Sequence, residues 1–298
     1  MPAPVLSGYT RGALLFIPTC ADEKSESHLL QYFWEEAGGY GARIALIAGD
    51  GDSLTAASRC HALFAGWETD SVEILSITSR EEALRPDNLE RVTGATGILL
   101  LGENPVRMAT FLGGTPLAQA IRRANAHGKV AAGYGRGAAL LCEHMIAHDA
   151  RAADDAHHPF LHRNLIQFAP GLGLTNRLVL DTIPAELGDG WNRLSRLLHA
   201  VSYNPFLVGL SLEVDTGAAI YQDNTLEIFG LHSALVVDGA GVTYTDIADF
   251  RNPKPLSLLG VKVHALAANF TYHLQERTAH PPQQSDIPQD AVPVKALT

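Results

Sequence analysis

A glycine-rich turn is the part of the sequence best suited to chemistry. Gly133-Tyr134-Gly135-Arg136-Gly137-Ala138 follows the apolar run Val130 to Ala132 and leads into Ala138 to Ala147, which we expect to be helical. A strand, a sharp glycine-rich turn and a helix make a nucleophile elbow, whose apex residue is a serine or cysteine. Here the apex is Gly135, which has no side chain. The sequence therefore predicts the framework of a nucleophilic enzyme without its nucleophile.

A second turn, Gly102-Glu103-Asn104-Pro105, follows the apolar run Ile98 to Leu101. Ligands of doubly wound sheets bind beyond the carboxyl ends of the strands, so both turns are expected to border one cleft. The predicted ligand-binding residues are Gly102, Glu103, Asn104, Tyr134, Gly135 and Arg136.

Arg136 is the predicted cleft residue with the most specific chemistry. Its planar guanidinium suits a carboxylate held by two parallel hydrogen bonds. The alternatives are an internal salt bridge or a contact with a partner protein. Asn104 likewise has an alternative, as an ordinary turn residue.

Other side chains near the elbow are poor replacements for the nucleophile. Cys142 lies seven residues after Gly135, ~10 Å further along a helix, and we expect a buried core thiol. To act as a nucleophile, Tyr134 would need a hydroxyl pKa below its ordinary value of ~10. The residues therefore argue against serine-type hydrolysis.

The histidines raise a metal hypothesis. His144 and His148 are four residues apart in the expected helix, a spacing that can place two imidazoles on one metal. Zinc sites of the thermolysin kind have a glutamate directly after the first histidine, where this chain has Met145. A polar loop follows, with His157, His158 and His162 among several aspartates. A solvated histidine-rich loop also explains this pattern, and we predict no metal and no cofactor.

The elements that must position these turns alternate along the first half of the chain. Buried strands are expected at Ala13–Ile17, Arg43–Ala48, Val72–Ile77, Ile98–Leu101 and Val130–Ala132, and helices at Ser27–Ala37, Ser53–Ala65 and Pro116–Ala126. Continuous apolar strands separated by helices are typical of a parallel sheet covered on both faces. We therefore predict a flavodoxin-like three-layer α/β/α sandwich.

The second half has shorter, more closely spaced strands. We expect strands at Leu207–Leu212, Ala218–Tyr221, Thr225–Phe229 and Leu235–Val237, as an antiparallel extension of the same sheet, and a final helix at Leu266–Leu274. The predicted organisation is one domain over residues 1–275 and a polar, proline-containing tail over 276–298.

Composition excludes several classes of protein. The 298 residues carry a formal net charge of −10, which disfavours binding to nucleic acid or to an anionic membrane surface. No apolar run approaches the roughly 20 residues of a membrane-spanning helix, and the N-terminus lacks the pattern of a signal peptide. Three cysteines form no disulfide framework, so we expect a cytoplasmic protein.

Several ordered motifs give the chain a family resemblance over roughly residues 10 to 275. They are Gly113-Gly114-Thr115-Pro116-Leu117, the elbow, Pro170-Gly171-Leu172-Gly173-Leu174, Arg193-Leu194-Ser195-Arg196-Leu197-Leu198 and Gly209-Leu210-Ser211-Leu212-Glu213-Val214. On these motifs the chain resembles the cyanophycinase family of serine peptidases, relatives of the α-aspartyl dipeptidases. The resemblance implies a class I glutamine amidotransferase-like fold.

The same resemblance implies that the catalytic residues are replaced. The position of the family's serine holds Gly135, that of its acidic residue holds Val214, and that of its histidine, two residues after Asp181, holds Ile183. A glutamine expected near the pocket is Pro105.

Three hypotheses about function follow. The first is a pseudoenzyme that binds an aspartyl/arginyl peptide or a protein, as a homodimer or as a heterodimer with an active homologue. The second is a hydrolase of β-aspartyl-arginine peptides with a non-standard nucleophile or a metal. The third is a structural subunit with a collapsed pocket.

Overall fold

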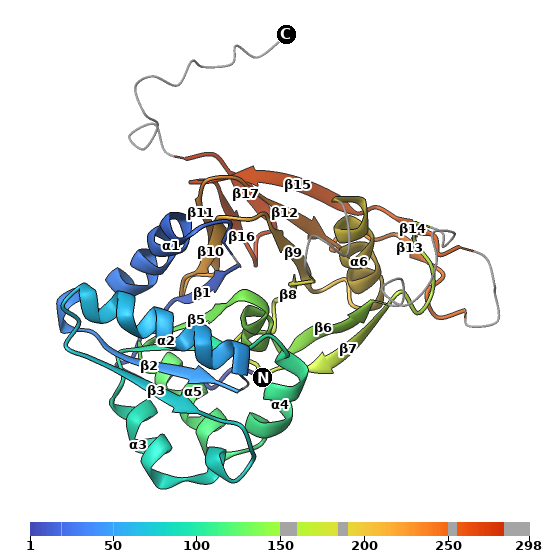
Figure 1. Ribbon diagram of the computed structural model, residues 1–298. Coiled ribbons are helices and arrows are strands. Elements are labelled where there is room, and N and C mark those ends of the chain that lie inside the picture. The colour runs from blue at the N-terminus through green and yellow to red at the C-terminus, as the bar shows by residue number, and fades with distance from the viewer. Residues whose placement is uncertain (19, 50, 150–159, 184–189, 250–254, 283–298) are drawn as a thin grey trace.

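A nine-stranded sheet forms the centre of the molecule (Figure 1). The computed structural model describes residues 1–18, 20–49, 51–149, 160–183, 190–249 and 255–282. In spatial order the strands are β17 (Thr278–His280), β16 (Thr271–His273), β11 (Thr225–Gly230), β10 (Thr216–Ile220), β1 (Leu14–Ile17), β5 (Val130–Tyr134), β4 (Gly97–Leu101), β2 (Arg43–Ala48) and β3 (Ser71–Ser76). The five strands from β1 to β3 in that order are parallel, and β10, β11, β16 and β17 extend the sheet in antiparallel fashion.

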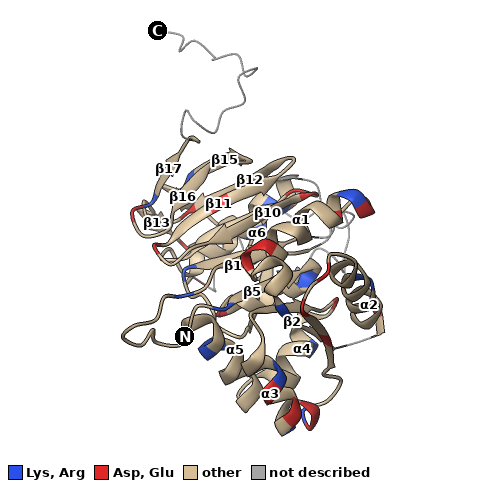
Figure 2. Ribbon diagram, turned by 90° about the vertical axis from the view of Figure 1, so that its left-hand side faces the viewer, with Lys and Arg blue, Asp and Glu red and all other residues tan. Residues whose placement is uncertain are grey.

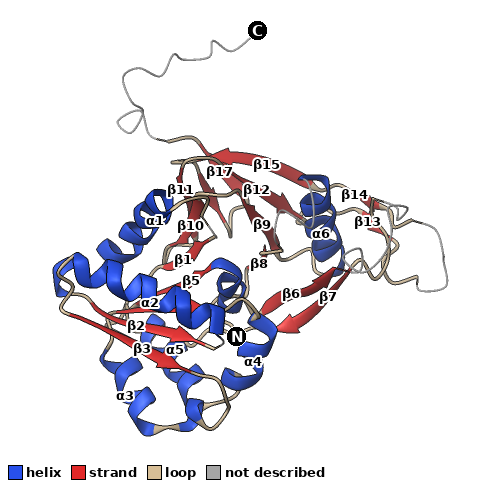
Figure 3. Cartoon of the chain, viewed as in Figure 1, coloured by secondary structure: helices blue, strands red, loops and turns tan. Residues whose placement is uncertain are grey.

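Helices cover both faces of the parallel part of this sheet (Figure 3). They are α1 (Glu23–Glu36) and α2 (Gly51–Gly66) on one face, and α3 (Pro86–Gly94), α4 (Pro105–Leu112) and α5 (Pro116–Ala126) on the other. Alternate residues of β1 enter the two cores: Leu15 and Ile17 pack with α1, whereas Leu14 and Phe16 enter the core that includes α5. The predicted three-layer α/β/α sandwich is therefore confirmed.

A second sheet packs against the first. Its order is β15 (Lys262–Ala267), β12 (Ser233–Asp238), β9 (Val208–Leu212) and β8 (Leu178–Asp181), and α6 (Gly190–Tyr203) covers one face. The expected extension of the main sheet is thus right for β10 and β11 and wrong for β9 and β12. Alternating side chains cannot reveal this difference, because either pairing would bury one face of these strands.

Two expected helices are wrong. Residues 138–147 form the end of a 3-10 turn, η3 (Gly135–Leu141), and then β6 (His144–Asp149), which pairs with β7 (Ile166–Pro170). Residues 266–274 belong to β15 and β16, separated by a turn in which Asn269 has φ +69°. In both cases strand pairing with distant segments overrides a local pattern compatible with a helix.

The remaining elements are short. They are η1 (Gly39–Gly41), η2 (Glu82–Leu84), β13 (Tyr244–Thr245) and β14 (Leu258–Leu259). Because β17 pairs with β16, the boundary expected at residue 275 falls inside the main sheet; residues 283–298 of the expected tail lie outside the described residues.

Acidic and basic residues are mixed on α1 and α3 (Figure 2). Among the helices that the structure describes, none has the length and apolar character needed to cross a bilayer.

Candidate functional site

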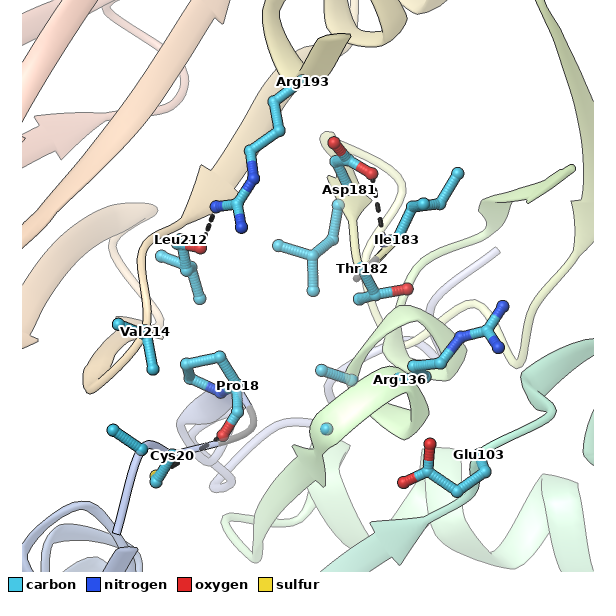
Figure 4. Close-up of a pocket in the computed structure, with 14 residues that line it drawn as sticks. Pro18, Cys20, Glu103, Arg136, Asp181, Thr182, Ile183, Arg193, Leu212 and Val214 are labelled. Carbon is cyan, nitrogen blue, oxygen red and sulfur yellow. Dashed lines mark hydrogen bonds between the residues drawn. The ribbon is translucent and has the colours of Figure 1, made fainter. Parts of the chain in front are cut away.

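A cavity of about 460 Å³ lies beyond the carboxyl ends of β1, β5, β8 and β9, where the main sheet meets the second sheet (Figure 4). Its walls are formed by Pro18, Cys20, Ala21, Glu103, Gly135, Arg136, Ala138, Leu180, Asp181, Thr182, Ile183, Arg193, Leu212 and Val214. This is the place at which doubly wound sheets bind ligands.

The strand and the sharp turn of the elbow form as the sequence predicts, whereas the helix expected after the apex does not. Gly135 follows β5 directly and has φ +58°, a left-handed conformation that a side chain makes costly. A Cβ on Gly133 would lie 2.3 Å from the Cα of Ala138, and one on Gly137 would lie 2.8 Å from the amide nitrogen of Gly102. The flanking glycines are therefore required by the tight packing of the turn.

The structure brings Gly135, Ile183 and Val214 to one cavity, although they are far apart in sequence. Gly135 comes from the elbow, Ile183 from the segment after β8, and Val214 from the segment after β9. Figure 4 places Val214 and Ile183 on different walls of the same space. The resemblance assigns these three positions to a serine, a histidine and an acid. In this chain the three positions share one site, but Gly135 has no side chain, and Ile183 and Val214 have alkyl side chains.

Two arginines, Arg136 and Arg193, line the cavity. The Nε of Arg136 is buried and has no hydrogen-bond partner among the described residues. Arg193 donates from Nη1 to the carbonyl oxygen of Leu212 at 2.9 Å. Glu103 lies on the same side as Arg136 and supplies one carboxylate (Figure 4). A buried donor without an acceptor is costly, so the wall around Arg136 favours a ligand that accepts hydrogen bonds.

Asp181 adds no free charge to the cavity. Its carboxylate accepts from Nε and Nη2 of Arg196 at 2.9 to 3.1 Å, and the Arg196 side chain is fully buried. Burial raises the pKa of Asp181, and the Arg196 guanidinium opposes that rise. Asp181 Oδ1 also accepts from the Ile183 amide at 3.2 Å. The ion pair therefore fixes the wall that presents Ile183.

Cys20 is the nucleophilic side chain that the sequence reasoning missed. It lines the cavity close to Pro18, and its Sγ donates to the Pro18 carbonyl oxygen at 3.7 Å. Burial, followed by the charge of Asp215, raises the pKa of the Cys20 thiol to about 12. Its place three residues after the predicted strand Ala13–Ile17 was the available signal, because carboxyl ends of parallel strands border the site.

The predicted ligand-binding residues divide into two groups. Glu103, Gly135 and Arg136 line the cavity, whereas Gly102, Asn104 and Tyr134 are not among its lining residues. Asn104 caps α4 by accepting from the Arg107 amide, and Gly102 packs behind the elbow against Gly137.

Tyr134 faces the opposite side of the main sheet. Its ring packs in the core under α1 and α2, and its hydroxyl donates to the Glu26 carboxylate. Burial and that contact raise the pKa of Tyr134. Strand alternation explains the outcome, because successive residues of β5 point to opposite faces.

The spacing of His144 and His148 was expected to place both residues on one helix, but they lie on a strand. His144 and His148 lie on strand β6 and not on the expected helix, so their spacing does not place them on successive turns of one helix. His162 Nδ1 lies 2.8 Å from the Arg163 carbonyl oxygen, and His157 and His158 lie outside the described residues. Within the described part of the chain, no group of three or more His, Cys, Asp or Glu side chains is arranged to hold a metal. Cys142 is fully buried, as expected, although in a turn before β6 rather than in a helix.

Comparisons with known proteins agree with this architecture. Residues 14–222 match the model of peptidase family S51. A cyanophycinase of Geminocystis herdmanii is 29% identical over 276 residues, covering 92% of this chain and 97% of the relative. A cyanophycinase of Synechococcus elongatus is 30% identical over 267 residues, covering 89% of this chain and 80% of the relative.

A solved structure shares the fold. The crystal structure of a peptidase from an acI-B1 actinobacterium superposes with a TM-score of 0.60 and 17% identity, covering 87% of this chain and 98% of the other. Together with the elbow and the position of its cavity, these matches show that the chain belongs to peptidase family S51.

Proposed function

We propose that this chain is a catalytically inactive, cyanophycinase-like member of its family that keeps the ligand cleft as a binding site. The observation that carries the proposal is the shared cavity of Gly135, Ile183 and Val214. Serine-type hydrolysis needs an oxygen or sulfur nucleophile within hydrogen-bond reach of a base. The elbow apex has no side chain, and no histidine lines the cavity in the part of the chain that the structure describes.

The cleft chemistry favours a peptide that carries both charges. Arg136 and Arg193 suit a carboxylate, and Glu103 suits an ammonium or guanidinium group. Peptides of aspartyl and arginyl units have these groups, and cyanophycinases are among the relatives of this chain. The proposed role is that of a binding, regulatory or scaffold subunit in the cytoplasm, as a homodimer or paired with an active homologue.

One observation favours a second candidate, a hydrolase of β-aspartyl-arginine peptides that uses Cys20 as nucleophile. The Cys20 thiol lines the same cavity as Gly135. A thiol with a pKa of about 12 is almost wholly protonated at neutral pH, which opposes this candidate, because the thiolate is the attacking form.

The test is to incubate the purified chain with cyanophycin and with the β-aspartyl-arginine dipeptide, beside an active family member, and to measure dipeptide binding by calorimetry. Binding without product release supports the proposal. Product release within about a hundredfold of the active enzyme, a loss of ~2.7 kcal/mol in transition-state stabilisation, overturns it. Loss of that release in Cys20→Ser would assign the nucleophile. Neither binding nor release would favour the structural-subunit hypothesis.

A further inference from the structure

A second concave site lies at the far end of the parallel sheet from the cleft. Helices α1 and α2 begin near the carboxyl ends of β1 and β2 and end at the opposite edge. Between their C-termini is a groove of about 320 Å³, which we call the aromatic groove, lined by Gln31, Trp34, Tyr40, Gly66, Trp67 and Glu68.

The rings of the aromatic groove form perpendicular walls. Trp34 meets Tyr40 edge-on, with centroids 5.2 Å apart and planes at 86°. Trp34 also meets Trp67, with centroids 5.7 Å apart and planes at 63°. The faces of aromatic rings carry negative quadrupole potential, so a ring face that borders the groove attracts a cation.

The walls are held in place before any ligand binds. The Trp34 indole donates from Nε1 to Thr69 Oγ1 at 2.8 Å, and Thr69 Oγ1 donates to the Phe64 carbonyl oxygen at 2.6 Å. Trp67 packs edge-on against the buried ring of Phe64, with centroids 5.6 Å apart. Little conformational entropy is therefore lost on binding, which favours recognition. Tyr40 is 70% exposed, so this wall is open to solvent.

The polar residues of the groove select the kind of cation. Glu68 contributes a carboxylate, and the six lining residues include no cationic side chain. The Gln31 amide nitrogen donates to Glu35 at 2.9 Å, which leaves the amide oxygen as an acceptor. A guanidinium both stacks on aromatic rings and donates hydrogen bonds to such acceptors, whereas a quaternary ammonium has no hydrogen to donate.

We propose that the aromatic groove binds the guanidinium group of an arginine side chain. The plane of the guanidinium lies against the tryptophan rings, and its N–H groups donate to Glu68 and to the Gln31 amide oxygen. This site does not depend on the function proposed for the cleft, because it shares no residue with the cleft.

The test uses the fluorescence of Trp34 and Trp67 in the full-length chain. Trp191, the third tryptophan, is 66% exposed and is removed by Trp191→Phe. Titration with an N-acetylated arginine amide should give a saturable change with a dissociation constant on the order of 1 mM. The citrulline analogue, which is neutral and nearly the same shape, should bind at least about fivefold more weakly.

Variants make the assignment specific. Tyr40→Ala and Glu68→Gln should each weaken arginine binding about threefold to fivefold, whereas the matched surface control Tyr244→Ala should leave it unchanged. Arg136→Met should also leave this titration unchanged, which separates the groove from the cleft. Equal binding of the arginine and citrulline compounds, tighter binding of tetramethylammonium, or no saturable change would each overturn the proposal.

Discussion

At the scale of single residues, Gly135 shapes the elbow that borders the cleft. The elbow around it is intact, with a left-handed φ of +58° and close packing of Gly133 and Gly137. Ile183 and Val214 have alkyl side chains and line the cavity at the positions where the family resemblance puts its base and its acid. Among the described residues that line the cavity there is no histidine, so a serine alone at position 135 would lack the family's base.

The first prediction concerns rebuilding the triad. Gly135→Ser combined with Ile183→His and Val214→Glu should hydrolyse the β-aspartyl-arginine dipeptide at least about tenfold faster than the natural chain, because triad residues act as a unit. Gly135→Ser alone should match the natural chain. Product release is followed by chromatography. If the single variant is as active as the triple one, Ile183 and Val214 do not occupy the triad positions.

The second prediction concerns Arg136. Its Nε is buried without a partner, so Arg136→Met should leave the free energy of unfolding unchanged or raise it by about 1 kcal/mol. The same substitution should weaken binding of the dipeptide about tenfold, because a charge-assisted pair is lost. Urea denaturation and calorimetry measure the two effects. Tyr134→Phe, on the far face of the sheet, is the matched control and should leave binding unchanged. A marked loss of stability in Arg136→Met would show that Arg136 has a structural role instead.

The third prediction concerns the reactivity of Cys20. A pKa of about 12, against an ordinary value of 9.0, lowers the thiolate fraction at neutral pH about a thousandfold. A more basic thiolate is also a stronger nucleophile, which offsets part of the loss in reaction rate. We therefore expect alkylation by iodoacetamide to be roughly thirtyfold slower than for an ordinary cysteine. The rate should still be rising with pH at pH 10. Rapid labelling at pH 7 would show an activated thiol and would favour Cys20 as a nucleophile.

At the scale of elements, the ion pair between Asp181 and Arg196 joins β8 to α6 and shapes one wall of the cleft. Both side chains are almost completely buried, with exposures of 1% and 0%. Removing one member of such a pair leaves an uncompensated charge, whereas replacing both removes the desolvation cost together with the attraction.

The fourth prediction follows from that asymmetry. Asp181→Ala or Arg196→Met alone should lower the free energy of unfolding by about 3–5 kcal/mol, and the double variant should be more stable than either single variant. Denaturation of the four proteins gives the coupling free energy. Additive losses would mean that the pair has no energetic coupling in the folded chain.

The sequence predicts the elements unevenly, for physical reasons. The parallel strands were predicted well, because a buried parallel strand is a continuous apolar run whatever its neighbours. The prediction of a helix after the elbow was wrong, because β6 forms only by pairing with β7, about twenty residues later in the chain. The residues of the cleft were predictable only where they follow a strand that the sequence reveals. Glu103, Gly135 and Arg136 do so, whereas Arg193 lies on α6, the helix that covers the second sheet.

At the scale of the whole molecule, a polar contact ties the two sheets together. Asp238 on β12 is fully buried and accepts from the Tyr272 hydroxyl on β16 and from Arg277, each at 2.9 Å. The cleft lies between the same two sheets, so its shape depends on their relative position.

The fifth prediction concerns this contact. Asp238→Ala removes the buried carboxylate that Arg277 and Tyr272 share, and should lower the free energy of unfolding by about 3–5 kcal/mol, whereas Tyr272→Phe should cost about 1–2 kcal/mol. Thermal unfolding followed by circular dichroism measures both. Equal effects of the two substitutions would show that the charge of Asp238 is not the important part of the contact.

The backbone of Gly135 also has a consequence for the history of such a chain. A serine held at φ +58° costs about 1–3 kcal/mol, and a glycine there avoids most of that cost. A change from serine to glycine at this position would therefore stabilise the folded chain, and the reverse change would destabilise it until a ligand or a second mutation compensates. Selection for stability alone would then favour an elbow with glycine at its apex.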